Sequence, residues 1–272
     1  MPTYHDLPLL KKPVWTWEVP TYFFIGGAAG AAAVVGLAAQ MGGGGDKLVR
    51  DARWVAAIGA GLSAPLLIAD LGRPERFLNM LRVFKPQSPM SVGAWTVAAF
   101  GAAATGAVLI PNRALRNAAA AAAAGTGVVM ATYTGVLLGA TAIPVWKQNV
   151  KLLPVLFSTS ALGSAVSILE LRGHRSSALN SLGLGAAIFE SAAEFAVNGS
   201  KEPESKPIRG GTVARLAGAL SGPIPLLLRL LGARRLAAAS TLAGSLATRI
   251  AWVEAGKASA ADVGVALDAK RA

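Results

Sequence analysis

Three long stretches of this chain contain no Asp, Glu, Lys or Arg: residues 19–45, 86–112 and 117–146. A helix of about 20 apolar residues crosses the hydrocarbon core of a bilayer, so each stretch is long enough to span a membrane. Only 15% of the 272 residues are charged, whereas soluble domains average about 25%. The sequence therefore predicts a polytopic membrane protein.

The charge balance is basic, with 26 Lys and Arg against 14 Asp and Glu. In a soluble domain such an excess would suggest a nucleic-acid partner. Here the basic residues lie in short connectors, as is typical of loops beside anionic lipid headgroups, so nucleic acid is not expected. The chain has no cysteine, which excludes disulfides, thiolate catalysis and iron–sulfur ligation by its own side chains.

Eight apolar segments predict an all-α fold of eight transmembrane helices, arranged as two four-helix bundles. Glu190 and Glu194 interrupt the sixth segment, and Pro223 and Pro225 interrupt the seventh. Abundant Gly and Ala favour close helix packing, because helices in lipid associate through small residues. The segments cover residues 18–40, 53–71, 91–110, 116–140, 152–171, 177–197, 212–231 and 234–253.

Residues 1–272 are interpreted as a single integral membrane domain. Its first four-helix half covers 13–147, its second half covers 148–254, and a C-terminal tail covers 255–272. The runs that begin at Tyr22 and Val155 share four residues at equal spacing, as a parallel internal repeat would. Such matches also arise by chance in a chain this rich in Ala and Gly.

The span count predicts the topology. An even number of spans places both termini on one face, here called side A, with the connectors at 72–90, 141–151 and 198–211. The opposite face, side B, holds the connectors near 41–52, 111–115, 172–176 and 232–233. The short connectors of side B are denser in Arg and Lys, so the positive-inside rule favours side B as cytoplasmic and the termini as outside.

The connector between the second and third spans contains an amphipathic pattern. Pro74 suits the first turn of a helix, and Phe77, Leu78, Leu81 and Phe84 follow at helical spacing. The pattern predicts a helix that lies on the membrane surface. It is either a plain connector or a docking platform for a partner subunit.

Three sequence motifs occur in order in the first half. They are W-T-W-E-V-P-T-Y-F-F-I-G-G from Trp15, D-L-G-R-P-E-R-F from Asp70 with N-M-L-R and F-K-P-Q-S-P-M-S-V-G-A-W after it, and Y-T-G-V-L-L from Tyr133. Together they resemble the NrfD family, the membrane subunits that include the polysulfide reductase anchor. The resemblance covers roughly residues 13–147.

The resemblance implies an eight-helix, haem-free subunit in a prokaryotic cytoplasmic membrane. Such a subunit exchanges electrons and protons between the quinone pool (menaquinone or ubiquinone) and a four-cluster ferredoxin-like iron–sulfur subunit. That partner usually serves a molybdopterin catalytic subunit, as in formate dehydrogenase or polysulfide reductase. The chain itself would then be the quinone-reactive, non-catalytic subunit of the complex.

Quinone chemistry needs hydrogen-bond donors to the carbonyl oxygens and a titratable route to water. An ionisable residue inside a membrane span is a functional candidate by default. Span direction places the candidates toward side A, with Glu18 and Tyr22 four residues apart on one helix face. The candidates are Glu18, Tyr22, Asp70, Tyr133, Glu190 and Glu194.

Read as a quinone site, four of these residues take distinct roles. Tyr22 and Tyr133 would donate hydrogen bonds to a quinone carbonyl, while Glu18, also at the quinone, and Asp70 would transfer protons. The polysulfide reductase branch has Asn and His near the start of its first helix, where this chain has Glu18 and Tyr22. The alternatives are that the tyrosines form an interfacial belt with Glu18 at the mouth of the first helix, and that Asp70 forms a loop-fixing salt bridge with Arg73 or Arg76.

Other residues are open to structural readings. Glu190 and Glu194 could begin a proton route or pair with Arg215 or Arg249. Tryptophans near span ends are typical of an aromatic belt at the membrane interface. These are Trp15, Trp17, Trp54 and Trp146.

Histidine placement excludes one related class of anchor. Dihaem cytochrome b anchors need paired axial ligands inside the bundle. His5 precedes the first span and His174 lies in a side-B connector, so neither can pair within the bundle. No metal site is predicted.

Two other functions fit the sequence. A secondary transporter built from repeated halves would need discontinuous helices and a site near the middle of the membrane. A purely structural anchor would carry no electrons or protons.

Overall fold

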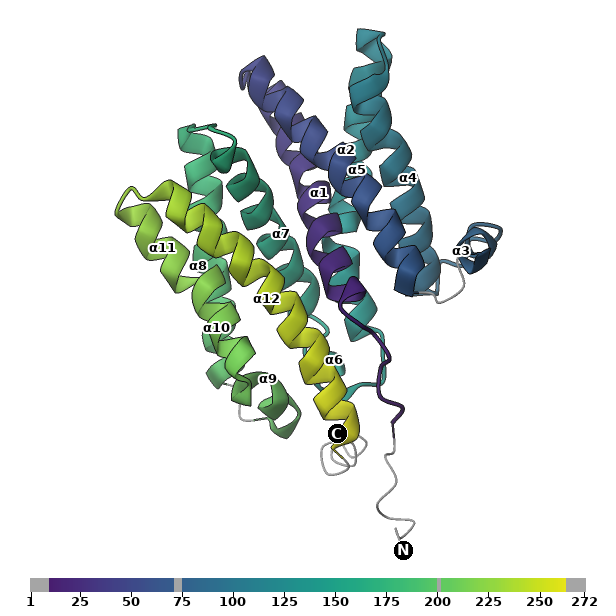
Figure 1. Ribbon diagram of the computed structural model, residues 1–272, viewed down its shortest axis with the longest axis vertical. Coiled ribbons are helices and arrows are strands. Elements are labelled where there is room, and N and C mark those ends of the chain that lie inside the picture. Colours follow the sequence, from purple (N-terminus) through teal and green to yellow (C-terminus); the bar gives the residue numbers. More distant parts are fainter. Residues whose placement is uncertain (1–9, 71–74, 200–201, 263–272) are drawn as a thin grey trace, which may run out of the picture.

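A computed structural model of the chain, shown in Figure 1, describes residues 10–70, 75–199 and 202–262. Within these ranges the chain is helical and contains no strand. The elements are α1 (Glu18–Met41), α2 (Asp46–Asp70), α3 (Glu75–Met80), α4 (Pro89–Leu109), α5 (Arg113–Gly139), α6 (Pro144–Gln148), α7 (Leu152–Leu171), α8 (Ser177–Gly199), η2 (Pro203–Ser205), α9 (Lys206–Gly210), α10 (Thr212–Ser221), α11 (Pro223–Leu230) and α12 (Arg234–Ala261).

Seven segments among the described residues are long and apolar enough to cross a membrane. They are α1, α2, α4, α5, α7, the combined stretch Thr212–Leu230 that contains α10 and α11, and α12. These findings confirm a multi-pass, all-α membrane protein. Helix α8 has 23 residues and is long enough, but it is not apolar enough to be counted among these segments.

Local sequence signals explain where the helices begin and end. Asn112 caps α5 by accepting a hydrogen bond from the Leu115 amide at 3.1 Å, and Pro89 occupies the first turn of α4. At the other ends, Gly43, Gly173 and Gly232 have positive φ angles after α1, α7 and α11. Left-handed glycines terminate helices without a Cβ clash. The resulting connectors are short and reverse the chain direction (Figure 1).

The short elements gather at one end of the long helices. Figure 1 shows α3, α6 and α9 at the end where α1 begins and α12 finishes, which corresponds to the predicted side A. The connectors after α1, α4, α7 and α11 lie at the opposite end, the predicted side B. The alternating helix directions agree with this assignment of connectors to the two ends.

Helix α1 lies at the centre of the packing. It contacts α2 and α5 in the first half, and α7 and α12 in the second. Helices α2 with α4, and α4 with α5, complete the contacts of the first half, while α7, α8, α10, α11 and α12 pack together in the second. The division into two four-helix bundles stays a prediction, because α1 belongs to the contact set of both.

A glycine contact sets the distance between α1 and α5. A Cβ atom on Gly30 would lie 2.5 Å from the carbonyl oxygen of Gly127, and one on Gly127 would lie 2.6 Å from that of Gly30. The two backbones therefore touch directly, as expected where small residues drive helix packing in lipid.

The helix bounds differ from the prediction in several places. Helix α2 starts at Asp46, seven residues before the predicted span, and α12 continues to Ala261, beyond the predicted end at 253. The surface helix α3 ends at Met80, so Leu81 and Phe84 lie outside it. Phe84 instead packs edge-on against Trp95 of α4, with ring centroids 6.1 Å apart.

The aromatic-belt interpretation is wrong for Trp146. Its side chain is fully buried, and its Nε1 donates to the carbonyl oxygen of Trp252 at 2.8 Å. Trp15 stacks on it with ring centroids 5.2 Å apart, and Gly256 leaves room for the indole. Trp146 thus joins α6, α12 and the segment before α1, whereas Trp17 and Trp54 are exposed as predicted.

Candidate functional site

Two tyrosines from different helices meet inside the molecule toward side A. Tyr22 lies in the second turn of α1 and Tyr133 lies in α5, and their hydroxyl groups form a hydrogen bond. Both side chains are buried. Because only one hydroxyl donates within the pair, the other O–H group remains as a donor for a third group. The pair is a neutral, buried hydrogen-bond donor.

Glycines on neighbouring helices make room for this pair. A Cβ atom on Gly93 of α4 would lie 2.5 Å from Cε2 of Tyr133. A Cβ atom on Gly26 of α1 would meet the Tyr22 ring, the Ser63 hydroxyl of α2 and Cε of Met130. The position of the Tyr133 ring therefore depends on the absence of a side chain at Gly93, whereas the atom closest to a Cβ on Gly26 would be Cε of Met130, at 2.5 Å.

Two carboxylates lie at the same end of the molecule. Glu18 is the first residue of α1, Asp70 is the last residue of α2, and both are partly buried. The Thr16 hydroxyl donates a hydrogen bond to Glu18, and the charges of Glu18 and Asp70 are close enough to repel each other. Carboxylates so placed can take protons from solvent at side A.

A second polar cluster lies between α7 and α12. The buried guanidinium of Arg249 donates from Nη2 to the Phe157 carbonyl oxygen at 3.0 Å, and from Nη1 to the hydroxyl groups of Ser160 and Ser245. Ser164 donates to Ser245 at 2.8 Å. The Cζ atom of Arg249 also lies 5.0 Å from the centroid of the Phe157 ring. The direct contacts of this cation are therefore neutral oxygens and an aromatic face.

Glu190 of α8 is a buried carboxylate beside this cluster, close enough to Arg249 for their opposite charges to attract each other. It is 3% exposed, and neither of its oxygens has a hydrogen-bond partner among the described residues. It lines a cavity of about 50 Å³ with Glu194, one turn later, and with residues of α10 and α12. A cavity of that size can hold water, which would offset the cost of burying the carboxyl group.

The predicted break in the seventh span lies next to this cavity. Helix α10 ends at Ser221 and α11 begins at Pro223, so the helix is interrupted at Gly222. A Cβ atom on Gly222 would lie 2.8 Å from the backbone nitrogen of Ser191, so α8 packs directly against the break. The predicted pairing of Glu190 or Glu194 with Arg215 or Arg249 is not found among the ion pairs of the described residues.

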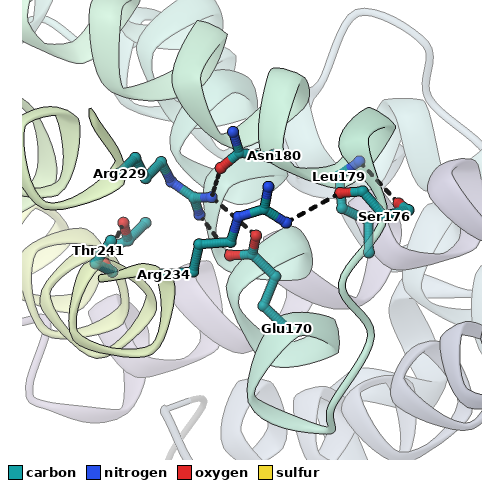
Figure 2. Close-up of polar contacts among 8 residues, drawn as sticks. Glu170, Ser176, Leu179, Asn180, Arg229, Arg234 and Thr241 are labelled. Carbon is teal, nitrogen blue, oxygen red and sulfur yellow. Dashed lines mark hydrogen bonds and ion pairs between the residues drawn. The ribbon is translucent and has the colours of Figure 1, made fainter. Parts of the chain in front are cut away.

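Figure 2 shows a buried ion pair toward side B of the second half. Arg229 of α11 donates from Nη1 and Nη2 to the two carboxylate oxygens of Glu170 in α7, at 2.9 and 2.8 Å. Nη1 also donates to the amide oxygen of Asn180 in α8 at 3.3 Å. The two charged residues are 2% and 4% exposed. The sequence prediction missed this pair, although both residues lie inside predicted spans, where a charged side chain is a signal in itself.

A further polar contact at this end joins the two halves. Asp51 of α2 is buried, and its Oδ2 atom lies 2.9 Å from Nε2 of His174 and 3.3 Å from Nε of Arg172. His174 and Arg172 belong to the connector between α7 and α8. The structure therefore places His174 in an interaction with a carboxylate at side B.

The structure thus groups the four residues of the predicted site at one end. Tyr22 contacts Tyr133, and Glu18 lies within electrostatic range of Asp70. Of the predicted partners of Asp70, Arg73 lies outside the described residues, as does the side chain of Arg76. Glu190 and Glu194 lie in a different region, against α10 and α12.

Comparison with known proteins gives one family match. A family model described as polysulfide reductase, NrfD_2, matches residues 1–263. No curated protein matches the chain. The match extends through the second half, where the sequence motifs offered no resemblance.

Proposed function

This chain belongs to the polysulfide reductase family NrfD_2, and from that membership we propose that it is the quinone-reactive membrane anchor of a respiratory oxidoreductase complex. The buried Tyr22–Tyr133 pair is the observation that carries the proposal. It offers a hydrogen-bond donor toward the same end of a multi-pass helical protein as two carboxylates, Glu18 and Asp70.

The proposed anchor has eight transmembrane helices. Helix α8 would be the eighth, since its 23 residues extend about 34 Å, more than the hydrocarbon core of a bilayer. It packs along α7, α10 and α11 and leads back from side B toward side A (Figure 1). Side B would face the cytoplasm of a prokaryotic cell, as its basic connectors favour.

The donor set of the site fits a quinone. When bound there, a quinone would supply two-electron chemistry coupled to two protons. The free O–H group of the tyrosine pair would hold one carbonyl oxygen, while Glu18 and Asp70 would exchange protons with water at side A. The role of the tyrosines is orientation and that of the carboxylates is proton transfer.

Electron supply requires a partner subunit. The chain has no cysteine with which to hold an iron–sulfur cluster. We therefore propose a four-cluster ferredoxin-like subunit as the partner and a molybdopterin enzyme as the catalytic subunit. The anchor should copurify with that iron–sulfur subunit, and recovery of the chain alone, fully folded and without a quinone response, would contradict the proposal.

The test of the site is quinone-linked turnover of the intact complex in membranes. We expect Glu18→Gln and Tyr133→Phe each to lower turnover on the order of 10²-fold, the usual contribution of a positioned proton-transfer group. The matched controls are Glu254→Gln, an exposed carboxylate, and Thr132→Val, a hydroxyl removed next to Tyr133. Unchanged turnover with normal assembly would instead indicate a purely structural anchor.

A second candidate function is secondary transport. The interrupted helix at Gly222 favours this function, because broken helices line the sites of many transporters. So does Glu190 beside it, a buried carboxylate that faces a cavity. Proteoliposomes that contain only this chain should then show ion flux, and Glu190→Gln should abolish that flux while Glu254→Gln preserves it. Absence of flux from the wild-type chain would dismiss the transporter.

A further inference from the structure

We propose that the side-B end of the first half binds the phosphate group of an anionic lipid. The candidate site is a hollow of about 820 Å³ between the end of α1, the start of α2, the end of α4 and the start of α5. It lies at the opposite end of these helices from the tyrosine pair. It is named here the arginine hollow, after its lining residues Arg50, Arg53, Arg113 and Arg116.

The arginine hollow has a large excess of positive charge. Its four arginines face a single lining carboxylate, that of Asp46. Within the part of the chain that the structure describes, none of the four arginines forms an ion pair. Arg53 and Arg116 are close enough for their charges to repel each other. An anion seated between them would relieve that repulsion.

Neutral groups of the protein bind the side chains of Arg53 and Arg116, and both guanidinium groups have further N–H donors. Nη2 of Arg53 donates to the amide oxygens of Gln40 and Asn117, at 2.6 and 2.9 Å. Nη1 of Arg116 donates to the backbone carbonyl oxygens of Ile110 and Pro111 at 3.4 and 3.3 Å. A guanidinium has five N–H donors, so each of these two arginines has further donors for phosphate oxygens.

The fold adds to the attraction for anions at this end. Helices α2 and α5 both begin at the arginine hollow, so the positive ends of two helix dipoles lie there. Basic pockets between membrane helices are a known mode of lipid headgroup recognition. The hollow combines these features at the depth where the spans end and headgroups lie.

The surface beside the hollow favours a lipid over free phosphate. Trp54 lines the hollow and is exposed, and Ile58 and Leu62 follow it on α2 as exposed residues. These three residues are spaced four apart, so they form one stripe along the helix toward the middle of the membrane. A phosphate held by the arginines would leave its acyl chains lying along this stripe.

The experiment uses the full-length chain, purified in detergent and stripped of lipid, with thermal unfolding followed during titration. The probes are phosphatidylglycerol, phosphatidylcholine and inorganic phosphate. We expect phosphatidylglycerol to raise the unfolding midpoint, and the other two probes to leave it unchanged. Stabilisation by inorganic phosphate to the same extent would overturn the lipid assignment, and an equal response to phosphatidylcholine would overturn the anion site.

Variants locate the binding. Arg50 and Arg113 are exposed, and among the described residues their side chains form no hydrogen bond or ion pair. Arg50→Gln with Arg113→Gln should weaken phosphatidylglycerol binding about thirtyfold, since each arginine near the headgroups contributes about a fivefold factor. The matched control, Arg82→Gln with Arg215→Gln, removes two exposed arginines on side A and should leave binding unchanged.

Single variants keep the test decisive if the double variant fails to fold. Arg50→Gln and Arg113→Gln alone should each weaken binding about fivefold. Binding by these variants equal to that of the wild type, or an equal loss in the side-A control, would contradict the arginine hollow as the site.

Discussion

The tyrosine pair of the first half and the arginine clusters of the second half bury polar groups in opposite ways. In the first half the buried pair is neutral: two phenols share a hydrogen bond, and the ring of Tyr133 packs against Gly93. In the second half the buried groups are ions, namely Arg249 among serine hydroxyls and Glu170 in a fork with Arg229. Neutral donors cost little to bury, whereas each ion must be matched by partners.

We infer that the neutral tyrosine pair serves ligand binding, whereas the buried ions serve the stability of the fold. The tyrosine pair keeps one O–H donor that the pair itself does not use, while Arg229 and Arg249 donate from both Nη atoms to groups of the protein. Glu190 is the exception in the second half, because it is buried, faces a cavity and has no hydrogen-bond partner among the described residues. Substitutions that remove polar groups from each half test this difference through the free energy of unfolding and through turnover.

The largest effect is expected at the buried ion pair. Arg229→Gln leaves the Glu170 carboxylate uncompensated, and loss of one partner of a buried pair costs about 3–5 kcal/mol. The measurement is the free energy of unfolding in detergent. Lys257→Gln breaks the partly exposed pair with Glu254 and serves as the control, with an expected cost below about 1 kcal/mol. Equal losses in both variants would mean that the Glu170–Arg229 pair is not desolvated.

An intermediate effect is expected from filling the glycine space beside the tyrosines. Gly93→Ala places a methyl group against the Tyr133 ring, and such overpacking costs about 1–3 kcal/mol. Unfolding in detergent gives the stability, and quinone-linked turnover of the complex should fall as well because the ring is displaced. Gly101→Ala in the same helix meets nothing within 4 Å and should leave both quantities unchanged. Normal turnover in Gly93→Ala would mean that the space at Gly93 is not required by the proposed quinone site.

The smallest effect on stability is expected at the tyrosine pair itself. Hydrogen bonds between membrane helices contribute about 0.6 kcal/mol on average. Tyr22→Phe, Tyr133→Phe and the double variant form a cycle in which the coupling free energy of unfolding should be about that value. A coupling above about 2 kcal/mol would make the pair a structural element like the ion pair of the second half.

Much of the fold could be predicted because the signals are local. A stretch without charges, a proline at a first turn and a glycine after a last turn each act through neighbouring residues, so α1, α4, α5 and α7 match their predicted spans to within a few residues. The break at Gly222 follows in the same way from Pro223 and Pro225. The direction of each span then placed the candidate residues at the correct end.

The end of the surface helix and the position of Trp146 were predicted wrongly, because contacts with distant segments decide both. Helical spacing continues from Phe77 to Phe84, but Phe84 packs on Trp95 and leaves the helix. Trp146 stands near a span end, where a belt position is typical, yet α6 folds back and buries it against α12. In both cases a contact with a distant segment overrode a local pattern.

The sequence by itself determined a multi-pass helical membrane protein, its approximate spans and the family to which its first-half motifs point. Only the tertiary structure decided which polar groups form hydrogen bonds: Tyr22 with Tyr133, Glu170 with Arg229, and Arg249 with serine hydroxyls. Charge-free stretches and helix ends are encoded residue by residue. Partners across helices depend instead on how closely backbones approach, as at Gly30 and Gly127, and no spacing along one helix specifies that distance.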